Sequence, residues 1–281
     1  MRKWMLYLLC AMFVLSGCAT GTIQPIHTEP PIVSNDNATE NITEPIMTSV
    51  CTEVPAETTR PLIDIPAGTH LRRYTSPQTG DYFDYYLFIP ENAVAGMPLM
   101  VFLHGDGEVN NVDSLGSCGP ILALREYYGD AFPCILIYPC TRQPSWTDGT
   151  VPETLMDLIG HVSWEFDTDP EHIIITGYSR GAIGVWYLIS EYGDFFSAAV
   201  PVSCGSDRAL NYENAAKVPV YALAGDEGYY ENIYKREMEK IVSQILTENG
   251  TAVFECLEGC GHVQTLSDAY SETVINWMLE K

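Results

Sequence analysis

The sequence predicts an α/β fold in which a mostly parallel central sheet is flanked by helices, with an antiparallel strand pair at its N-terminal end. Short apolar, β-branched runs alternate along the chain with longer stretches whose apolar residues recur at helical spacing. Several runs end in a glycine, as in "PLMVFLHG" (98–105) and "HIIITG" (172–177). With 281 residues, 46% of them hydrophobic, the chain can bury one large core.

The elements are expected in a regular order. An antiparallel pair comes first, over 70–76 and 81–90, joined through the turn residues "PQTG". Strands and helices then follow one another: strands at 98–105 and 134–139, a helix at 152–166, a strand at 172–177, a helix at 181–191, strands at 198–203 and 218–225, a helix at 231–250, a strand at 252–258 and a closing helix within 267–280.

The N-terminal region is typical of export. Arg2 and Lys3 precede the apolar run Trp4–Val14, which is too short to span a bilayer. The "LSGC" that ends at Cys18 resembles a bacterial lipoprotein signal, which implies cleavage before Cys18 and lipidation of its thiol. An ordinary secretory signal cut nearby is the alternative. We therefore expect a signal peptide over 1–17, a disordered tether over 18–60, a folded domain over 61–281, and a lipid-anchored location on the bacterial cell surface.

The charge of the chain limits its partners. There are 37 acidic and 14 basic residues, for a formal net charge of −23. Nucleic acids and anionic membrane surfaces attract clustered Lys and Arg, so neither is expected to bind. Membrane contact is expected through the lipid anchor only. Disulfide pairing and oligomeric state stay open.

The segment "GYSRG" (177–181) predicts a nucleophile. It has the G-x-S-x-G pattern, follows an apolar strand and precedes a helix-like stretch. Glycines on either side of Ser179 permit a turn so tight that the serine hydroxyl is lifted from the sheet edge. A serine in a purely structural turn is the alternative. In an open parallel sheet, functional groups collect at this carboxyl edge of the strands.

A serine nucleophile needs a base, and the base needs an orienting acid. His262 follows a strand in the glycine-flanked "GCGH", and we expect it to be the base. Asp226 is the first residue past the strand 218–225 and is our candidate acid, with the adjacent Glu227 in reserve. Glu231 lies one turn further on. A helix-capping role for Asp226 is the alternative.

Two backbone N–H groups are expected to form an oxyanion hole. One is that of Arg180, directly after the serine. The other is that of Asp106, in the loop "FLHGDGE" (102–108). His104, at the start of this loop, is expected to have a hydrogen-bonded structural role. No H-E-x-x-H, paired C-x-x-C or phosphate loop with a lysine occurs, so no metal or other cofactor is expected.

Taken together, "PLMVFLHGDGEVNN", "FPCILIYPC", "WTDG", "DTDPEHIIITGYSRGAIGVWYL" and "FECLEGCGHVQTL" resemble α/β-hydrolase esterases. The group that these segments are most similar to is the predicted-peptidase or dienelactone-hydrolase-like one, related to feruloyl and acetylxylan esterases. The resemblance implies the α/β-hydrolase fold and a metal-free serine hydrolase of carboxylic esters. Three departures stand out: Arg180 where family members often have Met, Asp106 where they often have Ala, and Gly228 where an ungapped match places the acid.

Aromatic residues beside the site loops are candidate substrate contacts. Trp146, Tyr178, Tyr229 and the neighbouring Tyr230 could stack on a sugar or a phenolic acid, although Trp146 could equally fill the core beneath the loop. The sequence therefore predicts a surface-anchored serine esterase that removes acyl groups from plant polysaccharide through a Ser179-Asp226-His262 triad. A serine peptidase and a non-catalytic carbohydrate-binding lipoprotein on a hydrolase scaffold are the alternatives.

Overall fold

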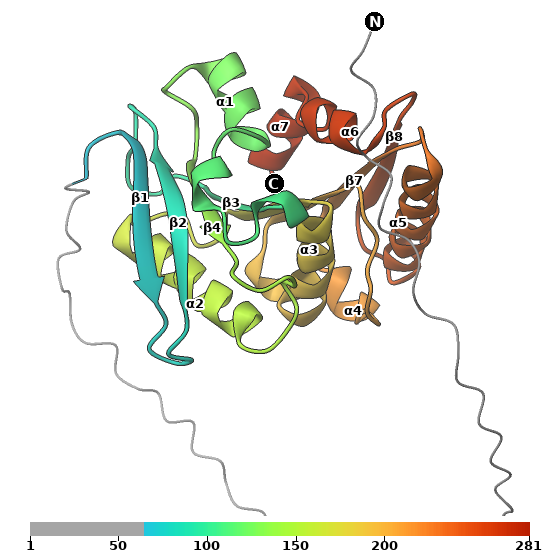
Figure 1. Ribbon diagram of the computed structural model, residues 1–281, viewed down its shortest axis with the longest axis horizontal. Coiled ribbons are helices and arrows are strands. Elements are labelled where there is room, and N and C mark those ends of the chain that lie inside the picture. The colour runs from blue at the N-terminus through green and yellow to red at the C-terminus, as the bar shows by residue number, and fades with distance from the viewer. Residues whose placement is uncertain (1–64) are drawn as a thin grey trace, which may run out of the picture. The chain divides into compact units, whose positions relative to one another are not determined.

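The computed structural model describes residues 65–281 (Figure 1). The expected signal peptide (1–17), tether (18–60) and lipidation site Cys18 lie outside the described residues. Within the described part, no helix is long and apolar enough to cross a membrane.

An eight-stranded sheet forms the centre of the fold, in the order β1-β2-β4-β3-β5-β6-β7-β8. The first two strands pair antiparallel with each other, β2 pairs antiparallel with β4, and the remaining pairs are parallel. The bounds are β1 (Gly68–Thr75), β2 (Tyr82–Ile89), β3 (Leu99–Leu103), β4 (Ile135–Cys140), β5 (Ile173–Tyr178), β6 (Ala198–Val202), β7 (Val220–Gly225) and β8 (Ala252–Leu257).

Helices cover both faces of this sheet. The longer ones are α1 (Pro120–Tyr128), α2 (Val151–Glu165), α3 (Arg180–Glu191), α5 (Tyr229–Thr247), α6 (His262–Asp268) and α7 (Glu272–Leu279). Residues 65–281 also contain a short α4 (Tyr212–Ala215) and three 3-10 helices, η1 (Asp106–Glu108), η2 (Val112–Ser114) and η3 (Gly193–Phe195). One core contains side chains of α2, α3 and α5, and the other contains side chains of α1 and α7. In Figure 1, α1 and α7 lie above the sheet and α2 and α4 below it.

The strand β3 shows why the central strands read as unbroken apolar runs. Leu99, Val101 and Leu103 point into one core, and Met100 and Phe102 point into the other. Side chains alternate between the faces of a strand, so a strand covered on both sides must be apolar at every position. All five residues are buried.

The predicted fold class is confirmed, including the antiparallel pair at the N-terminal edge. The predicted closing helix is instead two helices, α6 and α7. The side chain of Ser271 accepts a hydrogen bond from the N–H of Val274 and caps a new helix there. The helix α1 was not predicted, and among the described residues every cysteine is a free thiol.

Candidate active site

Ser179 lies in a strained turn between β5 and α3. Its backbone has φ 55° and ψ −118°, a conformation that residues with a side chain rarely adopt. A Cβ added to Gly177 would lie 2.6 Å from the carbonyl carbon and oxygen of Gly181, and one added to Gly181 would overlap the carbonyl oxygen of Leu103. The two glycines therefore allow α3 to begin directly beneath Ser179, as the sequence predicted.

His262 approaches Ser179 from the C-terminal end of the chain. It is the first residue of α6, just past β8, and its Nε2 lies 2.9 Å from Oγ of Ser179. The phenol of Tyr178 donates to the backbone oxygen of His262 at 3.0 Å, and the two rings lie 4.8 Å apart between centroids. The contacts with Tyr178 support His262, whose Nε2 is directed at the serine.

Glu231, in the first turn of α5, holds the other nitrogen of His262. Nδ1 of His262 donates to Oε1 of Glu231 at 2.5 Å. The second carboxylate oxygen accepts from Oγ of Ser203 at 3.0 Å and from the N–H of Gly225 at 3.1 Å. Glu231 is only 2% exposed, and these three donors satisfy a carboxylate that would otherwise be costly to bury. With Nδ1 as the donor, Nε2 is left as an acceptor for the serine proton.

The prediction of Asp226 as the partner of His262 is wrong. Although Asp226 follows β7 directly, its Oδ1 accepts the N–H of Gly259 at 2.7 Å and its Oδ2 lies 3.9 Å from Nζ of Lys235. The reserve, Glu227, is exposed and uses its backbone N–H to bond the oxygen of Cys260. Both residues thus bond the loop that leads to His262. The carboxylate that bonds the imidazole, that of Glu231, comes about one helical turn later in the chain.

A sequence signal for Glu231 existed and was missed. Along α5 the buried residues are Glu231, Met238, Ile241, Val242 and Ile245, which fall on one helical stripe. A carboxylate on the apolar stripe of a helix must have a partner inside the protein. The position of Glu231 in the first turn after β7, at the functional edge of the sheet, would have identified that partner as His262.

The loop after β3 carries the second expected oxyanion donor. An added Cβ on Gly105 would lie 3.4 Å from Cβ of Ser179, so this backbone passes directly beside the serine. Asp106 begins η1 and Arg180 begins α3, and the first N–H groups of a helix have no acceptor within it. The N–H groups of Asp106 and Arg180 therefore remain the candidate oxyanion donors, on two segments that meet at Ser179.

His104 holds this loop in place. Its buried ring donates from Nδ1 to the oxygen of Gly105 at 2.6 Å and accepts the N–H of Thr141 on Nε2 at 3.1 Å. Burial lowers the pKa of His104 to about 4, so the ring is neutral at pH 7. The expected structural role of His104 agrees with these contacts.

Two of the predicted substrate contacts, Trp146 and Tyr178, have other partners. Trp146 is 1% exposed, packs against the rings of Phe83 and His104, and donates to the backbone oxygen of His104 at 3.0 Å, so its prediction as a substrate contact is wrong. Tyr178 is 9% exposed and its hydroxyl is committed to His262, which makes it a support of the base.

Exposed tyrosines extend outward from His262. Tyr229 and Tyr230, at the start of α5, are 75% and 67% exposed, respectively. The rings of Tyr229 and Tyr230 lie 5.4 Å apart, those of Tyr230 and Tyr234 lie 6.4 Å apart and stacked, and that of Tyr234 lies 5.6 Å from His262. Tyr229, Tyr230 and Tyr234 form a tyrosine row that begins at the imidazole and ends in solvent.

Comparisons with known proteins place this geometry in a known fold. Residues 143–272 match the model of the dienelactone hydrolase family. A thermostable esterase superposes with a TM-score of 0.67 at 24% identity over 75% of this chain and 62% of its own. A ferulic acid esterase gives 0.60 at 16% identity, covering 77% of this chain and 99% of its own. The chain has the α/β-hydrolase fold.

A curated relative is similar over part of the chain. It is the bifunctional acetylxylan esterase/xylanase of Neocallimastix patriciarum, 21% identical over 147 residues. The match covers 50% of this chain but only 21% of that protein.

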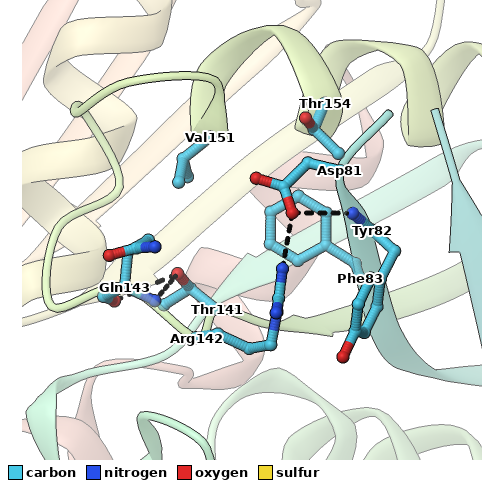
Figure 2. A pocket seen from close by; sticks show the side chains of 8 residues that line it. All are labelled: Asp81, Tyr82, Phe83, Thr141, Arg142, Gln143, Val151 and Thr154. Atoms are coloured by element: carbon cyan, nitrogen blue, oxygen red, sulfur yellow. Dashed lines mark hydrogen bonds and ion pairs between the residues drawn. The ribbon is translucent and has the colours of Figure 1, made fainter. Parts of the chain in front are cut away.

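A small pocket of the domain lies beside the end of β4 (Figure 2). Its volume is about 10 Å³, roughly the room for one water molecule, which is too small for an ester. Arg142 reaches Asp81 at 2.5 Å and lies 3.9 Å from the ring centroid of Tyr82. The contact between Arg142 and Asp81 therefore links the start of β2 to the segment after β4, whose Thr141 donates its N–H to His104.

Proposed function

We propose that the protein hydrolyses carboxylic esters through a Ser179-His262-Glu231 triad and an acyl-enzyme. The observation that carries the proposal is the unbroken chain of hydrogen bonds from Ser179 through His262 to the buried Glu231. A glutamate in this role replaces the predicted Asp226. Because this chain is complete, catalysis is favoured over a non-catalytic binding function for the scaffold.

Each residue of the triad has a distinct task in acylation. Oγ of Ser179 attacks the ester carbonyl carbon while Nε2 of His262 takes the hydroxyl proton. Glu231 stabilises the imidazolium that results, and it holds the ring so that Nε2 faces the serine. The tetrahedral intermediate then collapses: the bond from carbon to the alcohol oxygen breaks, and His262 returns the proton to the leaving alcohol.

Deacylation repeats these steps with water. His262 takes a proton from the water as its oxygen attacks the acyl carbon, and the bond to Oγ of Ser179 breaks. The proton then passes to Oγ, and the carboxylic acid leaves. In both halves the carbonyl oxygen becomes negative, and the N–H groups of Arg180 and Asp106 would stabilise it.

The proposed substrate is an acyl group on plant polysaccharide. The acetylxylan esterase relative and the ferulic acid esterase neighbour support this class. The tyrosine row supports it independently, because exposed aromatic faces beside a catalytic base suit the stacking of a sugar or a phenolic ring. Tyr229 and Tyr230 are the proposed contacts.

The proposed surface location is supported by the sequence rather than by the described residues. The "LSGC" signal at Cys18 supports cleavage, acylation of Cys18 and anchoring to the membrane of a bacterial cell. Metabolic labelling with an acyl analogue tests this. We expect the full-length parent to be labelled and membrane-bound and a Cys18→Ala variant to be neither. An unlabelled, freely secreted parent would contradict the anchor.

The reaction itself is tested with substrates side by side: short p-nitrophenyl esters, feruloyl esters and peptides. We expect hydrolysis of esters, with Ser179→Ala reducing kcat by several orders of magnitude at an unchanged melting temperature. Ser190→Ala is the matched control, since Ser190 is a buried serine of α3 whose hydroxyl bonds Tyr187 within that helix. Ester hydrolysis by Ser179→Ala within tenfold of the parent would contradict the proposal, and cleavage of peptides alone would make the protein a peptidase.

A further inference from the structure

Arg180 and Asp106 form an ion pair directly beside Ser179. Nη2 of Arg180 donates to Oδ2 of Asp106 at 2.8 Å, and Nε contacts Oδ1. The Nη2 contact is a hydrogen bond, whereas the Nε contact is an ion-pair contact without hydrogen-bond geometry, so the two groups are held together by one hydrogen bond and by their opposite charges. Since Arg180 begins α3 and Asp106 begins η1, the pair joins the nucleophile turn to the loop after β3.

These two residues are also the ones that would supply the oxyanion donors through their backbone N–H groups. An oxyanion hole works only when both donors are held at hydrogen-bond distance from one point. The ring of His104 holds the loop at the carbonyl oxygen of Gly105, and the ion pair holds the side chain of the next residue, Asp106. The side chains are 36% and 62% exposed, so the pair adds little to global stability, and its effect falls on local geometry.

The charges of the pair matter as well as its shape. A lone carboxylate on Asp106 would oppose the negative charge that develops on the ester oxygen, and Arg180 neutralises it.

We propose that the Arg180–Asp106 ion pair is a brace that positions the two oxyanion donors, so that both side chains act as positioning residues. The inference rests on the proposed function, because it requires the Ser179 reaction. It assigns to these side chains a task separate from that of their own backbone N–H groups.

A double-mutant cycle on a neutral short-chain p-nitrophenyl ester tests the brace. We expect kcat to fall about 50-fold in Arg180→Met, about tenfold in Asp106→Ala, and only about tenfold in the double variant, because removing both side chains also removes the unpaired carboxylate. KM should stay within about threefold in all of them, since the donors act on the transition state. In Arg180→Lys, which keeps the positive charge but not the planar guanidinium, kcat should fall about tenfold.

The Arg73–Asp84 pair provides the matched control. It is also an Arg–Asp ion pair near the surface, with two hydrogen bonds of 2.6 and 2.8 Å, but it joins β1 to β2. Its cycle, Arg73→Met with Asp84→Ala, should leave kcat within twofold. Additive losses at Arg180 and Asp106, losses that fall on KM alone, or full activity in Arg180→Lys would overturn the brace. Melting temperatures show that each variant is folded, and loss of activity in Ser179→Ala keeps a failed brace distinct from a failed function.

Discussion

Glu231 accepts a 2.5 Å hydrogen bond from His262, a residue 31 positions further along the chain. The contact joins the first turn of α5 to the first residue of α6, and β8 lies between them in sequence. Oε1 of this carboxylate faces the imidazole, and Oε2 is bonded by Ser203 and Gly225. The base of the candidate site is thus oriented by a fully bonded, buried acid.

Because of this contact, a substitution of Glu231 should affect catalysis far more than a substitution of the nearby Asp226. Glu231→Gln should lower kcat by about 10³ to 10⁴ with little change in KM, because an amide disfavours the required tautomer and does not stabilise the imidazolium. Asp226→Asn should lower kcat less than tenfold, since Asp226 bonds Gly259 instead. Steady-state kinetics on one ester check both variants, and a larger loss in Asp226→Asn than in Glu231→Gln would reverse the assignment.

Ser203 should contribute to catalysis through its hydrogen bond to Glu231. It is fully buried in a positive-φ conformation, with φ 57°, that directs its hydroxyl to Oε2. Ser203→Ala removes one of three donors, and a hydrogen bond to a charged group contributes about 1.5–3 kcal/mol, so kcat should fall about tenfold or more. An unchanged kcat, measured beside Ser190→Ala as control, would show that Glu231 is held without this serine.

The oxyanion loop should make stability depend on pH through His104. Burial lowers the pKa of His104 in the folded protein to about 4, whereas the unfolded chain has a value near 6.5. Between these values the unfolded state binds the proton and the folded state does not, so stability falls as the pH falls. From pH 7 to pH 5 this group should cost about 2 kcal/mol of unfolding free energy.

Denaturant unfolding of the parent and of His104→Gln at both pH values isolates this effect, because the carboxylates are common to both proteins. His104→Gln should have a lower free energy of unfolding than the parent at pH 7. Its free energy of unfolding should fall less than that of the parent between pH 7 and pH 5. Equal losses in the two proteins would show that His104 does not titrate differently on folding.

The tyrosine row should govern recognition of large substrates. Tyr229→Ala and Tyr230→Ala should raise KM severalfold for a feruloylated oligosaccharide and leave short p-nitrophenyl esters unaffected, because only the larger substrate reaches the exposed rings. Trp164→Ala is the control, since Trp164 is 52% exposed on α2. Equal effects on small and large esters would place the row outside the substrate path.

The sequence predicted the elements whose signals are local. Apolar periodicity identified all the strands of the described sheet, and the glycines around Ser179 and His262 marked functional turns. It did not identify Glu231, because the role of that residue depends on how α5 turns back over the end of β7. The choice between a substrate contact and a core residue stayed open for Trp146 for a similar reason: only the packed structure shows that Gly184 leaves the space it fills.

The central claim is tested most directly by trapping the acyl-enzyme. The protein is mixed with a p-nitrophenyl ester, quenched with acid, digested and analysed by mass spectrometry. We predict an acyl group on the peptide that contains Ser179 and none in Ser179→Ala. The group should accumulate most in a His262 variant in which deacylation is slowed more than acylation. Hydrolysis with no acyl group on that peptide, or with the group on another residue, would contradict it.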